Sequence, residues 1–285
     1  MVRSKHIIAV AAVFALVFFT VLLIQGCATK PTTPAPIESP VPAPTAQPLD
    51  LRSAVRGIVE QHPKCSGYKW KDRSVAPEGY MNGMAFTFAR SYCRTKKIPA
   101  LSVAKAAGDP ATDALAHYDK QSAAGLPALL DVWTLSLGLG MRESSGKYCE
   151  GRDLSATNTA ADTAEAGLFQ ASANSLSAHP ELESYAADYA ANLPACELPL
   201  FAEGVNAAHP SCKPKVVGEG KGAAWQELTR QCPAFAAEYA ATLIRARRKH
   251  FGPLNRKEVE FKPECRAMFE KVAQLVDNNL AVVCP

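Results

Sequence analysis

From residue 50 onward, apolar side chains recur at the spacing of α-helices rather than in the alternation typical of strands. In the segment 51–62, Leu51, Val55, Ile58 and Val59 fall on one helical face. A second stripe in 78–96 is formed by Met81, Met84, Ala85, Phe88 and Tyr92. Further helices are predicted at 109–121 with Asp109 or Thr112 as cap, at 126–144, 172–193 and 234–252, and from about 263 to the region of Val276. The segment 194–222, rich in Gly and Pro, is predicted to be irregular. The pattern predicts a mainly α-helical protein with one folded domain.

The first 49 residues have a different composition. Arg3 and Lys5 precede an apolar run of about 18 residues, which ends in Gln25-Gly26-Cys27. A basic start followed by an apolar core is typical of an export signal, although a run of this length also suffices for a transmembrane helix. Residues 28–49 are rich in Pro, Thr and Ala and are predicted to form an extended tether of roughly 60 Å.

The sequence Ile24-Gln25-Gly26-Cys27 resembles the lipobox of bacterial lipoproteins, with Gln25 departing from the small or aliphatic residue common at that position. The resemblance implies a signal peptide over 1–26, a lipid anchor on Cys27, a membrane-anchored tether over 27–49 and a folded domain over 50–285. The protein is then expected in the cell envelope. In a Gram-negative host, Thr29 and the lack of an Asp beside the anchor favour the outer membrane, facing the periplasm.

Nine cysteines are present, and removing Cys27 leaves an even number. None lies in a C-x-x-C pair, which argues against a zinc ribbon or a thioredoxin-like site. In an exported protein, scattered even-numbered cysteines indicate disulfides, here four bridges whose pairing the sequence leaves open. The eight are Cys65, Cys93, Cys149, Cys196, Cys212, Cys232, Cys265 and Cys284. Free buried thiols are the alternative.

The charge balance and the histidines exclude several functions. With 31 basic and 27 acidic residues, the net charge of +4 gives no reason to expect nucleic acid as a partner. The six histidines show no metal-ligand spacing, and no cofactor or metal is predicted.

One carboxylate, Glu143, stands near the end of the predicted helix 126–144. It follows the apolar run 135–141, and both burial and the negative end of a helix raise a carboxyl pKa toward a value useful for proton donation. Gly138, Gly140 and Gly146 are expected to leave room for a ligand to approach the backbone. A solvated surface Glu is the alternative interpretation.

The sequence Met141-Arg142-Glu143-Ser144-Ser145-Gly146, followed by Gly167-Leu168-Phe169-Gln170, is similar to paired motifs of lytic transglycosylases and goose-type lysozymes. The resemblance implies a lysozyme-like fold and cleavage between N-acetylmuramic acid and N-acetylglucosamine, with Glu143 as general acid. It also implies saccharide contacts for Ser144, Gly167, Leu168, Phe169 and Gln170. The interval of 27 residues from Glu143 to Gln170 is longer than usual and contains Cys149. The family's tyrosine motif is missing in clean form: Tyr189 is a poor match, and Tyr239 is only a guess.

A second carboxylate decides the reaction type. Inverting hydrolysis needs a base ~6.5–9.5 Å from the acid, whereas a lytic transglycosylase uses the sugar's own 6-hydroxyl. Asp153, Asp162 and Glu165 follow Glu143, and the sequence favours Asp162. Each has a simpler interpretation as a solvated loop acid or, for Asp162, an Asx turn.

These observations predict a lipid-anchored peptidoglycan glycosidase, either a muramidase or a lytic transglycosylase. Its expected partners are glycan strands and, through Cys27, a membrane. The alternative is a non-catalytic envelope lipoprotein that binds glycan or a protein.

Overall fold

A computed structural model of the chain describes residues 49–102, 113–120, 124–152, 160–213, 216–248 and 252–284. The chain divides into two units, Met1–Ala46 and Gln47–Pro285, and the described residues belong to the second. The predicted signal peptide, most of the tether and Cys27 lie outside the described residues, as does Asp153.

The described part of the chain is mainly helical and contains no strand, which confirms the predicted fold class at this level. Besides the short 3-10 helices, the elements are α1 (Leu51–Glu60), α2 (Pro63–Ser66), α3 (Glu78–Lys97), α4 (Ala114–His117), α5 (Gly125–Ser144), α6 (Pro180–Ala191), α7 (Leu198–Phe201), α8 (Gly220–Gln231), α9 (Pro233–Arg247), α10 (Pro263–Asn278) and α11 (Leu280–Val283).

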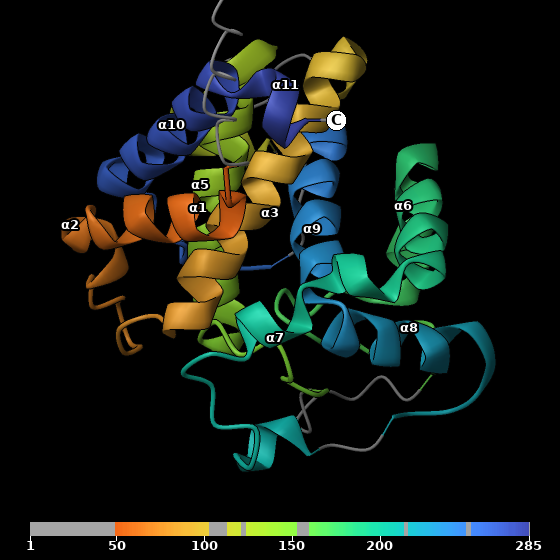
Figure 1. Cartoon of the computed structure of the whole chain (residues 1–285). Coiled ribbons are helices and arrows are strands. Elements are labelled where there is room, and N and C mark those ends of the chain that lie inside the picture. Colours follow the sequence, from red (N-terminus) through yellow and green to blue (C-terminus); the bar gives the residue numbers. More distant parts are fainter. Residues whose placement is uncertain are drawn as a thin grey trace, which may run out of the picture. The chain divides into compact units, whose positions relative to one another are not determined.

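Three long helices, α3, α5 and α9, form the centre of the domain. Helix α9 packs against both α3 and α5 and carries α6 on its other side (Figure 1). It begins with Pro233 in its first turn. Backbone N–H groups there have no partner within the helix, so a proline, which lacks the N–H, costs no hydrogen bond. Its residues are buried on nearly all sides, Phe235 and Tyr239 included. A helix at the centre of a domain contacts neighbours on all sides.

Helix α10 covers one side of α3 and α5 (Figure 1). Phe269 of α10 packs against Phe88 of α3 with ring centroids 5.1 Å apart, and Phe88 packs against Trp133 of α5 at 5.6 Å. Trp133 and Trp225 are both buried in the core.

Ionic pairs with buried members tie the helices together. Glu238 of α9 pairs with Arg94 of α3, and Asp131 of α5 accepts from Arg266 of α10 at 2.9 Å. Buried carboxylates are costly unless paired, so each bond fixes the registry of two helices. Arg248, just after α9, likewise donates to the buried Asp113 at 2.6 Å.

Four disulfides staple the domain, as the even cysteine count predicted: Cys65–Cys265, Cys93–Cys284, Cys149–Cys212 and Cys196–Cys232. The first two join α2 and α3 to the C-terminal helices across 200 and 191 residues. Closing loops of this length removes much conformational freedom from the unfolded chain.

The prediction of an irregular segment at 194–222 is wrong in part. Helix α7 lies inside it, and α8 begins in it at Gly220. Phe201 of α7 is fully buried against Gly83 of α3, where an added Cβ would lie 2.6 Å from the phenyl ring. This close approach is a tertiary contact, which local Gly and Pro content does not reveal. The short helix α4 is capped by Asp113, and the predicted caps Asp109 and Thr112 lie outside the described residues.

Candidate functional site

Glu143 is the penultimate residue of α5, whose end is held firmly. Ser145 and Gly146 take left-handed φ angles of 56° and 72°, which stop the helix. The Arg73 side chain donates to the carbonyl oxygens of Met141 and Arg142 at 3.2 and 2.6 Å. These bonds satisfy terminal carbonyls and fix the position from which Glu143 projects.

The three glycines near Glu143 do not leave room for a ligand, and that expectation is wrong. A Cβ at Gly138 would lie 2.3 Å from the Glu260 carbonyl oxygen, and one at Gly140 would lie 2.2 Å from the Tyr80 hydroxyl. At Gly146 the space is filled by Pro77 and Tyr80. The absent side chains instead permit tight packing within the protein.

A cavity of about 810 Å³ opens beside Glu143, within the size range of small-ligand pockets. Its walls come from the ends of α5, the segment 165–178, one face of α9 and the turn 252–256. The lining residues are Leu139, Glu143, Glu165, Phe169, Gln170, Ala171, Ser172, Asn174, Ser175, Ser177, Ala178, Tyr239, Ala240, Leu243, Arg247, Gly252, Pro253 and Arg256. Helix termini and loops from distant parts of the sequence therefore converge on one carboxylate.

The environment raises the pKa of Glu143 to about 7. Burial is the main cause, because it removes water from the charged form, and the negative charge of Glu165 adds to it. The guanidinium groups of Arg256 and Arg142 act in the opposite direction. Near neutral pH a substantial fraction of Glu143 therefore carries a proton, as a general acid requires.

The Gly167–Gln170 segment forms a tight turn beside the cavity. Gly167 and Gln170 have positive φ angles of 77° and 46°, and Ala166 bridges to Ala171. Phe169 and Gln170 line the cavity, whereas Leu168 is fully buried in the core. Two of the five predicted contact residues, Phe169 and Gln170, thus meet Glu143 in one cavity.

Ser144, Gly167 and Leu168 do not line the cavity, contrary to the saccharide contacts that the resemblance implied. Ser144 is 2% exposed, and its hydroxyl donates to the Gly140 carbonyl oxygen at 3.0 Å. A Cβ at Gly167 would lie 2.8 Å from the carbonyl oxygen of Thr229, so this glycine permits close packing. All three residues therefore contribute to the packing of the interior.

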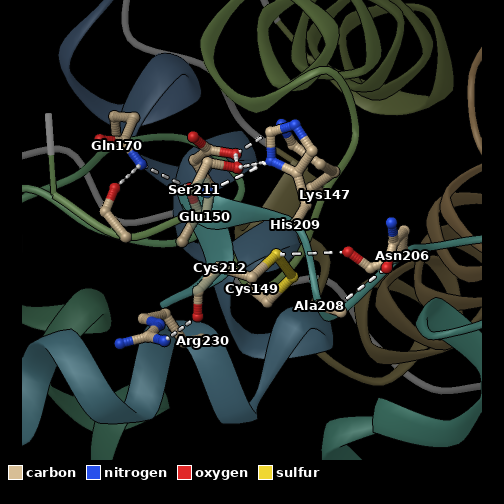
Figure 2. Close-up of a disulfide and its surroundings, with 12 residues drawn as sticks. Lys147, Cys149, Glu150, Gln170, Asn206, Ala208, His209, Ser211, Cys212 and Arg230 are labelled. Carbon is tan, nitrogen blue, oxygen red and sulfur yellow. Dashed lines mark hydrogen bonds and ion pairs between the residues drawn. A yellow bond between two sulfur atoms is a disulfide. The ribbon is translucent and has the colours of Figure 1, made fainter. Parts of the chain in front are cut away.

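Figure 2 shows how the Cys149–Cys212 disulfide braces this wall. The bridge joins the loop after Glu143 to the segment before Lys213. Next to it, Ser211 donates its hydroxyl to Glu150 at 2.8 Å, and Gly151 donates its N–H to the Ser211 carbonyl oxygen at 2.7 Å. Gln170 in turn donates its amide to the Gly151 carbonyl oxygen at 3.1 Å. The unusually long interval between the two motifs is thus held by a covalent bond and hydrogen bonds.

The structure changes the order of preference among the second carboxylates. Asp162 is exposed and does not line the cavity, so the structure does not bring it together with Glu143 there. Its backbone carbonyl accepts from the Asn174 N–H at 2.9 Å. Glu165 lines the cavity and acts electrostatically on Glu143. The sequence placed Glu165 among the candidates but offered no signal to prefer it.

Tyr239 lines the cavity from α9, whereas Tyr189 lies in the core and donates to Glu238 at 3.0 Å. The Tyr239 hydroxyl lies 2.6 Å from the Ser175 hydroxyl. Because Ser175 gives its own proton to the Ser172 carbonyl oxygen, Tyr239 is the donor to Ser175. Burial raises the pKa of Tyr239 to about 12, so it remains a neutral donor.

No group of His, Cys, Asp and Glu suited to a metal occurs among the described residues. Within the same ranges, no helix is long and apolar enough to span a bilayer. No family model, curated protein or solved structure matches this chain.

Proposed function

We propose that this chain cleaves the β-1,4 glycosidic bond between N-acetylmuramic acid and N-acetylglucosamine in peptidoglycan, with Glu143 as the general acid. One observation carries the proposal. The Glu143 carboxyl, at the end of a buried helix, has a pKa raised to about 7 and lines a cavity large enough for a saccharide.

The chemistry follows from the residues of the wall. Protonated Glu143 donates its proton to the glycosidic oxygen, the bond from that oxygen to the anomeric carbon breaks, and positive charge develops on the sugar ring. The negative charge of Glu165, in the same cavity, would stabilise that positive charge. Attack by water yields a reducing end, whereas attack by the sugar's 6-hydroxyl yields a 1,6-anhydro end. In both cases the attacking hydroxyl group loses a proton to a carboxylate of the cavity, Glu165 or the newly ionised Glu143.

The resemblance of the Glu143 and Gly167–Gln170 motifs to lytic transglycosylases and goose-type lysozymes supports the choice of peptidoglycan. Four disulfides are consistent with an oxidising compartment, where the cell wall lies. A lysozyme-like fold, the lipid anchor on Cys27 and a place in the cell envelope belong to the same proposal.

The decisive experiment incubates the full chain in detergent with purified peptidoglycan and identifies the released products by mass spectrometry. Glu143→Gln keeps the side-chain shape and removes the transferable proton, so we expect at least a hundredfold loss of product. Glu227→Gln is the matched control, since Glu227 is exposed on α8 outside the cavity. No release of fragments by the unaltered chain contradicts the proposal.

One observation favours a non-catalytic glycan-binding protein as the second candidate. The Tyr239 hydroxyl is engaged by Ser175, so this candidate for the tyrosine that would hold the acid has another partner. Binding of the unaltered chain to peptidoglycan without any release of fragments would establish this second function.

A further inference from the structure

One face of α9 forms a continuous wall of the cavity. Tyr239, Ala240, Leu243 and Arg247 lie along it, and all four line the cavity. Eight residues of helix separate Tyr239 from Arg247, which corresponds to about 12 Å. The wall thus passes from aromatic and apolar side chains to a cation at the end of the helix.

Arg247 differs from the neighbouring arginines in its ionic partners. Arg245 donates to Glu181 at 2.5 Å, and Arg248 donates to Asp113. Arg256, the other arginine of the cavity, makes two bonds to Glu258 of 2.6 and 3.1 Å. Among the residues that the structure describes, no carboxylate pairs with Arg247. Among the described residues of the cavity, Arg247 is therefore the cation without a carboxylate partner.

The local contacts of Arg247 leave it able to bind an anion. Its side chain is exposed, and one guanidinium N–H donates to the Ala178 carbonyl oxygen at 3.3 Å. A guanidinium carries five N–H donors, so this bond uses a minority of them. Ser177 also lines the cavity, but its hydroxyl already donates to the Asn174 carbonyl oxygen at 3.0 Å, so Arg247 itself supplies the donors. A planar guanidinium with several N–H groups to spare is well suited to a carboxylate.

We propose that Arg247 forms a subsite for a carboxylate carried by the glycan, so that the site selects acidic strands over neutral ones with the same β-1,4 backbone. This inference rests on the proposed function and specifies its substrate. The carboxylate has two sources: the lactyl group of a peptide-free muramic acid, or the terminal and side-chain acids of an attached peptide. Either carboxylate would be repelled by the negative charge of Glu165 and attracted by the positive charge of Arg247.

The test measures binding separately from cleavage. Fluorescently labelled strands are titrated against the full chain carrying Glu143→Gln, with and without Arg247→Gln, by fluorescence polarisation in detergent. The strands are a neutral N-acetylglucosamine oligomer, a peptide-free strand with free lactyl carboxylates, and a peptide-bearing strand. Lys271→Gln, an exposed change on α10, is the control for net charge alone.

We expect Arg247→Gln to weaken binding of one acidic strand or both by about tenfold, the size of one lost charge-assisted hydrogen bond. Binding of the neutral oligomer should not change, and Arg247→Lys should restore part of the loss. The strand that responds identifies the source of the carboxylate. Equal effects on neutral and acidic strands, or none on either, overturn the subsite.

Cleavage of the same strands by the unaltered chain keeps the two hypotheses distinct. If no strand is cleaved but acidic strands depend on Arg247 for binding, the glycosidase proposal fails and the subsite stands. If strands are cleaved and Arg247→Gln leaves their binding intact, the subsite fails and the glycosidase proposal stands.

Discussion

The carboxyl groups of Glu143 and Glu165 line one cavity, and the charge of Glu165 helps to raise the pKa of Glu143 to about 7. Glu143 lies at the end of α5, and Glu165 lies two residues before Gly167, where the Gly167–Gln170 turn begins. Pairs of carboxyl groups whose environments separate their pKa values are a means of assigning acid and base roles. In the proposed reaction Glu143, whose pKa is raised mainly by burial, is the acid, and Glu165 is its candidate partner.

The first prediction concerns Glu165→Gln. Removing this negative charge favours the ionised form of Glu143, so its pKa should fall, although by a fraction of a unit because burial is the larger cause. The alkaline limb of the pH–activity profile should move to lower pH. An unmoved limb would show that Glu165 does not act on the acid.

The same variant separates the two reaction types. If Glu165 activates water, Glu165→Gln should reduce the formation of reducing ends by at least a hundredfold. If the sugar's own hydroxyl attacks, anhydro products should persist at a rate within about tenfold of the original. Mass spectrometry of the fragments distinguishes these results.

The second prediction links Glu143 to stability. Its pKa is near 4.3 in an unfolded chain and about 7 in the folded protein. Between these values the folded state binds more protons, so the free energy of unfolding decreases as the pH rises from 4 to 7. Above pH 7 the full cost of the buried charge applies, up to about 4 kcal/mol before allowance for partial exposure.

Glu143→Gln cannot ionise and should escape this cost. We expect its melting temperature to equal that of the unaltered chain at pH 4 and to exceed it by several degrees at pH 8. Calorimetry at both values checks the result, with Glu227→Gln as the control that should show no such divergence. A lower melting temperature of Glu143→Gln at pH 8 would contradict the buried-acid interpretation.

Local patterns in the sequence predicted most of the helices. The stripe from Met81 to Tyr92 is buried in α3, and the prolines at positions 127, 233 and 263 all lie in the first turn of a helix. Such signals depend on residues a few positions apart, which the helix itself brings together. Helix α7 was missed because its burial comes from Phe201 meeting α3, a contact across more than a hundred residues.

The functional site shows the same difference between local signals and long-range contacts. Glu143, Phe169 and Gln170 stand in short motifs and were identified in advance, and the structure places them in one cavity. Arg247 carried no local signal that separated it from Arg245 and Arg248. Only the positions of Glu181 and Asp113, which pair with those two, reveal which arginine is left for a ligand.

The third prediction tests the packing of α5 under the site. At Gly140 an added Cβ would lie 2.2 Å from the Tyr80 hydroxyl and 3.2 Å from Phe169. Gly140→Ala should therefore lower the free energy of unfolding by about 1–3 kcal/mol, as overpacking does in other cores. It should also reduce activity, because Phe169 lines the cavity.

Gly57→Ala in α1 is the matched control, since a Cβ there meets nothing within 4 Å. In an open helical position, alanine should stabilise the protein by about 0.5–1 kcal/mol. Urea denaturation of both variants checks the difference. Equal effects of the two substitutions would mean that Tyr80 moves aside without cost.

The fourth prediction compares two disulfides. The Cys149–Cys212 disulfide supports the loop whose Gly151 carbonyl oxygen accepts from Gln170, a residue of the cavity wall. The Cys93–Cys284 disulfide joins α3 to the C-terminal end of the chain, and neither cysteine lines the cavity. Replacing either pair by alanine should cost about 2–5 kcal/mol of stability.

Only Cys149→Ala/Cys212→Ala should also reduce activity at a temperature where both variants remain folded, because the loop that holds Gln170 in place loses its covalent support. The loss of activity should appear mainly as a higher KM, because Gln170 lies in the cavity wall. The kcat should change little, because Arg73 still holds the end of the helix that carries Glu143. Equal activity of the two variants would show that the hydrogen bonds of Glu150 and Gly151 hold the wall without the covalent bond.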